Sequence, residues 1–282
     1  MRRILLTVFM CVTFEYATPD GRQTADSARF DSASITVNAS NDAAGGCCRI
    51  QPDGRVTASS VTVQQLIQSA YQRYIFDERP MSGLPEWAGS IRFDIAAAAS
   101  APPVFDADGA APQLASMLRN LLADRFKLRI RTEASNQPIY VLTLAKGRTE
   151  PGPRLRRVDV DCGAEMAKMI RGEMPPKPLC ATASYPGRLV TSALPMSAIA
   201  GLLSKIVDRP VINRTDLDGR FDIDLEAVEI RPPGPFGPSY RPSETKQSVF
   251  SSLPEQLGLE LRPETGAVEV LIVEHVEKPT EG

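Results

Sequence analysis

The sequence predicts an α+β protein made of two tandem copies of one small βαβ-βαβ-type module, each with two helices packed on a small sheet. Apolar residues recur with helical spacing in some segments and alternate with strand spacing in others. Four of these segments occur twice, in the same order and at nearly constant separation, which indicates a duplication. The 282 residues are 43% hydrophobic, enough for one large core or two smaller ones.

The clearest repeated element is an amphipathic helix that follows a Gly-Arg turn and a short strand, first at Gly54 and again at Gly187. Thr62 and Gln65 have the spacing of a capping box before the first helix, and Pro195 suits the first turn of the second. The apolar faces consist of Val63, Leu66, Ile67, Ala70 and Tyr71 in the first copy, and of Met196, Ile199, Ala200, Leu203 and Ser204 in the second.

Three further matches complete the repeat. Phe-Asp-Ile occurs in alternating strand-like runs at Phe93 and Phe221. Helix-to-strand segments then begin at Leu121 and Ser252, and terminal strands begin in the two copies at Ile139 and Val268. Each copy is therefore expected to contain strand, helix and strand, followed by helix, strand and strand.

The boundaries of the copies follow from composition. We expect a first repeat over 29–147 and a second over 187–279, joined by a proline-rich connector over 148–186. A proline-rich loop over 231–242 interrupts the second repeat. Pro254 falls inside the second helix of that repeat and is expected to shorten or kink it.

Residues 1–25 are predicted to be a signal peptide. Arg2 and Arg3 precede an apolar run from Ile4 to Phe14 that is too short to span a bilayer. We therefore expect a periplasmic or secreted protein without a transmembrane span in the mature chain. A disordered N-terminus without a signal is the alternative.

The net charge limits the kinds of partner the protein can attract, and the cysteines suggest which of them form disulfides. The chain has 32 basic and 34 acidic residues, so it offers no long-range attraction for nucleic acid, and we expect no such partner. Cys162 and Cys180 flank a loop-like segment and are a candidate disulfide, with free half-buried thiols as the alternative. For the vicinal Cys47 and Cys48, we consider two alternatives: a local disulfide between them, or a disulfide with another chain.

A family resemblance adds to this interpretation. The stretches GRVTASSVTVQQLIQSAYQ, SGLPEWAGSIRFDIAA, MLRNLLADRFKLRIRTEASNQPIYVLTLAKG and RPVINRTDLDGRFDIDLE resemble an uncharacterised, soil-associated Solibacter-type family multiplied in acidobacteria. Some members resemble fusions to membrane metallopeptidases of the β-lactam-sensor type, which implies a sensing or binding role. Each half also resembles the short N-terminal module of secretins and TonB-dependent receptors, which implies a final hairpin and a peptide or signalling partner in the envelope.

The sequence carries no complete catalytic set. His275 is the only histidine, in an acidic setting that predicts an edge-strand or surface position. Asp216, Asp218, Asp222 and Asp224 surround a Gly turn; we interpret them as turn residues, with a calcium loop or a carboxylate pair as alternatives. No catalytic residue, cofactor or metal site is therefore predicted.

The expected function is a non-enzymatic binding or sensing module with an unidentified protein or peptide partner. Trp87 and Leu84 form the candidate partner surface, since the single tryptophan lies in a loop between units. Two other functions remain open. One is a hydrolase that uses carboxylates such as Asp222 or Asp224, and the other is a structural component of the envelope.

Overall fold

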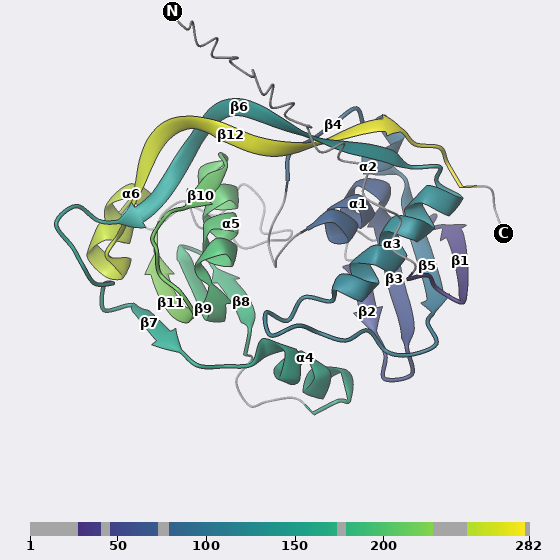
Figure 1. Ribbon diagram of the computed structural model, residues 1–282, viewed down its shortest axis with the longest axis horizontal. Helices are drawn as coiled ribbons and strands as arrows, with labels where there is room; N and C mark the ends of the chain where they lie inside the picture. The colour runs from purple at the N-terminus through teal and green to yellow at the C-terminus, as the bar shows by residue number, and fades with distance from the viewer. Residues whose placement is uncertain (1–27, 41–45, 73–78, 174–178, 228–246, 280–282) are drawn as a thin grey trace, which may run out of the picture.

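The computed structural model describes residues 28–40, 46–72, 79–173, 179–227 and 247–279. Figure 1 shows two lobes side by side, with a long two-stranded ribbon running across both of them. Each lobe contains a four-stranded antiparallel sheet and helices. The α+β class predicted from the sequence is confirmed.

The first lobe has a sheet in the order β1-β5-β3-β2. Gln65 N donates to Thr62 Oγ1 at 3.2 Å, so the expected capping box starts the first helix, whose apolar face is buried. The elements are β1 (Ser32–Val37), β2 (Gly46–Ile50), β3 (Arg55–Thr62), α1 (Val63–Tyr71), α2 (Trp87–Ser90), β5 (Arg92–Ala98) and α3 (Pro112–Arg125).

The second lobe has a sheet in the order β7-β11-β9-β8. Two of its strands and one helix come from residues 148–186, the segment expected to be a connector, so this segment contributes to the sheet. The elements are β7 (Leu155–Val158), α4 (Cys162–Ile170), β8 (Ala181–Tyr185), β9 (Arg188–Pro195), α5 (Met196–Val207), β11 (Arg220–Glu226), α6 (Val249–Ser252) and the π-helical turn η1 (Leu253–Leu257). Pro254 lies in that π-helical turn, directly after the four-residue α6.

The ribbon consists of β6 (Arg129–Leu144) and β12 (Leu259–His275), which pair antiparallel along their whole length. Two short strands add to it in parallel: β4 (Met81–Ser82) pairs with β12 near one end, and β10 (Val211–Asn213) pairs with β6 near the other. The ribbon therefore carries one short edge strand from each lobe.

Both ribbon strands pass from one hydrophobic core to the other. Leu128, just before β6, lies in the core of the first lobe, and Leu142 near the end of β6 lies in that of the second. In β12, Leu259 is buried in the second lobe, and Leu271 in the first. Burial of one leucine contributes about 1.5–3 kcal/mol, so each lobe depends on a strand whose other end belongs to its neighbour.

The expected hairpins at the ends of the two copies are wrong, because each predicted strand pair is a single continuous strand. β6 and β12 pair with each other instead of each folding back on itself, and Gly266 lies opposite Gln137. The prolines that suggested turns, Pro138 and Pro263, are compatible with the continuous strands. Tyr140 and Leu271 donate their N–H groups away from the ribbon, and Pro138 and Pro263 occupy positions with the same outward orientation, where no ladder hydrogen bond is lost.

Two of the sequence predictions concern residues that the structure does not describe. The signal peptide of residues 1–25 and the loop over 231–242 lie outside the described residues. Within the described ranges, the structure contains no helix with the length and apolar character needed to cross a membrane.

Candidate functional site

A cleft of about 620 Å³ lies between the two lobes, beside the ribbon. The first lobe lines it with α1 and the residues that lead into β4, and the second lobe with the end of α5 and with β10. Ala267, Val268 and Glu269 of β12 complete the lining. Ligand pockets typically measure about 300–1,000 Å³ and often lie between domains, so size and position make this cleft the candidate site.

Two Arg-Pro dipeptides, at 79–80 and 209–210, line the cleft from opposite lobes. The carbonyl oxygen of the first proline accepts a hydrogen bond from Leu271 N at 2.9 Å, and that of the second accepts one from Tyr140 N at 2.8 Å. Each dipeptide is thus hydrogen-bonded to one ribbon strand, and this hydrogen bond fixes the position of the arginine backbone.

The cleft carries three cationic and two anionic side chains. Arg79 Nη1 lies 3.5 Å from Glu269 Oε2, and the arginine side chain is only 10% exposed. The guanidinium carbon of Arg209 lies 4.6 Å from the ring centroid of Tyr140. The exposed Lys205 and Asp208 are the other charged groups. The lining therefore has a formal excess of one positive charge, in a chain whose net charge is −2.

The cleft reaches β12 at the edge of the strand. Successive side chains of a strand point to opposite faces, so a cleft lined by three consecutive residues must meet the strand edge-on. Leu271 donates outward to β4, and the two-residue period directs the N–H and C=O groups of Ala267 the same way. Within the described residues, β4 pairs with β12 only at Leu271 and Ile272, so Ala267 lies beyond this pairing.

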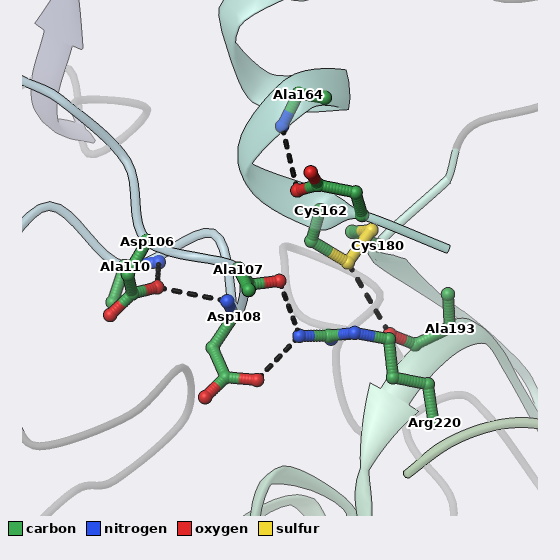
Figure 2. Close-up of polar contacts among 10 residues, drawn as sticks. Asp106, Ala107, Asp108, Ala110, Cys162, Ala164, Cys180, Ala193 and Arg220 are labelled. Atoms are coloured by element: carbon green, nitrogen blue, oxygen red, sulfur yellow. Dashed lines mark hydrogen bonds and ion pairs between the residues drawn. A yellow bond between two sulfur atoms is a disulfide. The ribbon is translucent and has the colours of Figure 1, made fainter. Parts of the chain in front are cut away.

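A second contact joins the lobes near α4, and Figure 2 shows its hydrogen bonds. Arg220 Nη2, from the second lobe, donates to Ala107 O at 2.6 Å and forms an ion pair with Asp108, both in the loop between β5 and α3. The loop is held in shape by Asp106, whose Oδ1 accepts from the backbone N of Asp108 and Ala110, each at 2.9 Å. The lobes are therefore connected both through the ribbon and through this loop.

The predicted disulfide between Cys162 and Cys180 is confirmed and lies at the same contact. Both cysteines are buried, and their Cα atoms are 5.7 Å apart. The bridge joins the start of α4 to the segment that leads into β8. A side chain at Gly163 would collide with the carbonyl of Asp106, so the loop from the first lobe packs directly on α4. Cys48 is also disulfide-bonded.

The aspartates of the two Phe-Asp-Ile motifs stabilise β-bulges. Asp94 Oδ1 accepts from Ser60 N at 2.8 Å, and Asp222 Oδ1 accepts from Ala193 N at 2.8 Å. Ser60 and Ala193 have φ angles of 52° and 55°, a conformation that is unfavourable for residues other than glycine. Each carboxylate thus binds the N–H of a bulged residue in the strand that precedes α1 or α5.

The arginine before each motif binds the carbonyl oxygen of the same bulged residue. Arg92 Nη1 donates to Ser60 O at 2.7 Å, and Arg220 Nη1 donates to Ala193 O at 3.0 Å. In β11, Asp224 accepts two hydrogen bonds from Arg188, both at 2.7 Å, and the hydrogen bonds from Arg188 lower the pKa of Asp224. The carboxylates considered for hydrolysis are thus bonded to groups of their own sheet.

The lowered pKa of Asp94 leads us to predict that the stability of the protein depends on pH. Its pKa is lowered first by the hydrogen bond from the Asn38 side chain and then by that from Ser60 N. A lowered pKa gives stability that is present above the unfolded value of ~3.9 and lost as the pH falls through the folded value. In urea unfolding, Asp94→Asn should therefore reduce the loss of stability between about pH 5 and about pH 3. An unchanged loss would contradict this role.

His275 lies at the end of β12, where its Nε2 is 2.7 Å from Glu277 Oε1. The histidine side chain is 38% exposed, and exposed pairs contribute at most about 1 kcal/mol. We expect His275→Gln to leave the free energy of unfolding within about 0.5 kcal/mol of wild type in thermal circular dichroism. A larger loss would show that the histidine has a structural role.

Trp87 and Leu84, the candidate partner surface, are half-buried against the core of the first lobe. Lys278 Nζ lies 5.9 Å from the ring centroid of Trp87, and neither Trp87 nor Leu84 lines the cleft. Sequence reasoning missed the residues that do, including Arg79 and Arg209. The Arg-Pro dipeptide would not have found them by itself, because it occurs five times in the sequence, at 79, 209, 231, 241 and 262.

The fold and the cleft define an α+β protein with a charged cleft between two lobes that share a ribbon. A family model described as a protein of unknown function, DUF3738, matches residues 64–276, and the chain belongs to this family. No curated protein and no solved structure matches it. The described part of the chain contains no group of three or more side chains of His, Cys, Asp or Glu arranged to hold a metal ion.

Proposed function

We propose that the protein is a non-enzymatic binding module that holds its ligand in the cleft between the two lobes. The observation that carries the proposal is the cleft itself, which is lined by both lobes and by the ribbon that joins them. A ligand there contacts three separate parts of the chain at once. Binding would therefore stabilise the arrangement of the lobes, as a sensing module requires.

We further propose that the two lobes derive from a duplicated module. The strand orders β1-β5-β3-β2 and β7-β11-β9-β8 correspond strand for strand in chain order, which supports this origin. The Arg-Phe-Asp-Ile motifs also make the same bonds to a bulge in both sheets. The same reasoning retains the resemblance to the acidobacterial family and to the secretin-type module as a proposal.

Export to the periplasm or the cell exterior is the compartment that we propose. The buried Cys162–Cys180 bridge supports it, because disulfides persist mainly in oxidising compartments. The carboxylate hydrolase has less support. Asp222 and Asp224 are bonded to the backbone of β9 and to Arg188, and neither lines the cleft.

The binding proposal is tested by hydrogen–deuterium exchange on the full chain, with and without fractions of an envelope extract. We expect a fraction that slows exchange at 209–212 and 267–269 and raises the thermal midpoint. Saturation at 100 times Kd contributes about 2.7 kcal/mol. The ligand should be recovered chemically unchanged by mass spectrometry.

Two charge reversals provide the control. Lys205 lines the cleft and Lys146 does not, so Lys205→Glu and Lys146→Glu change the net charge equally but alter the cleft only in the first case. Protection should be lost in Lys205→Glu and retained in Lys146→Glu. Equal protection in both variants would place the ligand elsewhere, and a consumed ligand would show that the protein is an enzyme.

A further inference from the structure

We propose that the contact of Arg220 with Ala107 and Asp108 is a latch that holds the two lobes closed around the cleft, and that the lobes open about the ribbon when this latch is released. The inference rests on the proposed function and concerns the regulation of the same cleft. Three features support it: the middle of the ribbon, which reaches neither core, the position of the latch on the opposite side of the molecule, and the bonds of Arg220 to both lobes.

The middle of the ribbon is the hinge. No residue of 131–138 in β6 or of 262–270 in β12 is buried, and the two hydrophobic cores share no residue. A two-stranded ladder that packs on no core resists bending weakly, and lobes with separate cores are expected to move relative to each other. Residues 267–269 of the cleft lining lie in this part of β12, so bending there changes the width of the cleft.

The latch lies on the side of the molecule that is opposite to the ribbon. Figure 1 shows the ribbon along one side of both lobes and α4 on the other side. Arg220 binds Ala107 and Asp108 beside α4, as Figure 2 shows. Rotation about the ribbon separates the lobes most where they are farthest from it. The bonds of the latch must therefore break before the lobes open.

Arg220 connects the latch to the sheet of the second lobe. Its side chain is only 11% exposed, and its Nη1 donates to Ala193 O at 3.0 Å, so the guanidinium is held in place by its own lobe. Arg92 makes the equivalent bond to Ser60 O in the first lobe, but within the described residues it forms no bond to the second lobe. A bulge therefore needs only one nitrogen of its arginine, and the other nitrogen of Arg220 serves the contact between the lobes.

The latch combines a close fit with a weak ion pair. A side chain at Gly163 would lie 2.4 Å from Asp106 O, so α4 and the loop of the first lobe are in direct contact. The Asp108 side chain is 64% exposed, and exposed ion pairs are weak, so the contact can break and re-form while both lobes stay folded. A ligand that touches both lobes favours the closed arrangement. Ligand and latch therefore stabilise the same state.

Asp108→Arg tests the latch in the full chain, because it places two cations at the contact. Asp124→Arg is the matched control: Asp124 is 53% exposed and also pairs with an arginine, but that pair lies within the first lobe. Small-angle X-ray scattering measures the radius of gyration. We expect a larger radius than wild type in Asp108→Arg and an unchanged radius in Asp124→Arg. An equal increase in both variants would overturn the latch, because it would follow from the charge reversal alone.

Gly163→Ala breaks the same contact by size and leaves every charge in place. Gly46→Ala is its control, because a side chain there would meet nothing within 4 Å. We expect a larger radius in Gly163→Ala only. Hydrogen–deuterium exchange should also become faster at 107–110, which the opening separates from α4, and at 267–269, where the ribbon bends. Far-UV circular dichroism confirms that each variant is folded.

An unchanged radius in both Asp108→Arg and Gly163→Ala overturns the latch. The binding proposal then stands, because the protection of the wild-type cleft by an extract fraction tests it separately. If no fraction protects that cleft, the binding proposal fails. A larger radius in the two latch variants would still show that the lobes open about the ribbon.

Discussion

Leu271→Ala, a change in the last strand of the chain, is expected to destabilise the first lobe by about 2–5 kcal/mol. Leu271 is fully buried in the core that also contains α1, α3 and strands β3 and β5. Truncation removes buried methyl groups and leaves a cavity in a core whose other buried residues, apart from Val273, lie between Ile35 and Leu128. The effect should therefore appear far from the mutation along the chain.

The single tryptophan provides the measurement. Trp87 packs against the first-lobe core, so its fluorescence reports on that lobe during urea unfolding. The Trp87 transition should move to lower urea concentration in Leu271→Ala. Val104 is 73% exposed, and Val104→Ala should change the free energy of unfolding by less than about 0.5 kcal/mol. An unmoved Trp87 transition in Leu271→Ala would show that the lobe is stable without the ribbon.

Removal of the Cys162–Cys180 bridge is the second large effect. Its sequence separation is 18, and a loop of about 15 residues corresponds to roughly 3 kcal/mol in the chain-entropy estimate. We expect the double variant Cys162→Ala and Cys180→Ala to lose about 2–5 kcal/mol of stability in guanidinium unfolding. The loop that contains Ala107 and Asp108 should also exchange its amide hydrogens faster, because it packs on α4.

Reductant provides the control for the bridge. It should destabilise the wild-type protein more than the double variant, because Cys48 remains in both proteins and contributes equally to the two measurements. Equal destabilisation by reductant would assign the effect to other cysteines. A double variant as stable as wild type would show that packing alone holds α4 in place.

Local elements of the fold were predictable from sequence, because they depend on neighbours along the chain. The helix from Val63 to Tyr71 follows from its apolar spacing and from the cap at Thr62. The shortening near Pro254 follows from the missing N–H of proline. The Cys162–Cys180 bridge followed from the loop between the two cysteines.

The ribbon and the cleft were not predictable in the same way. The segments around Pro138 and Gly266 have the composition of turns, and only pairing between strands from different parts of the chain extends them. The cleft depends on that pairing, because it brings Arg79 and Arg209 to the same place from opposite lobes. Local patterns do not contain this information, and the Arg-Pro dipeptide that both positions share also occurs at three other places in the sequence.

The path of β12 has a consequence for the order of events during synthesis. Leu271 and Val273 complete the first core, yet the ribosome makes them well after the other buried residues of that core, which lie between Ile35 and Leu128. The first lobe emerges early with a gap that only the last strand closes, and until then part of its apolar surface is open to water. Pairings between such distant segments form slowly, because a long loop must close before they contribute. Final packing of both lobes must therefore wait until β12 has been synthesised, and the nascent chain is most exposed to aggregation before that point.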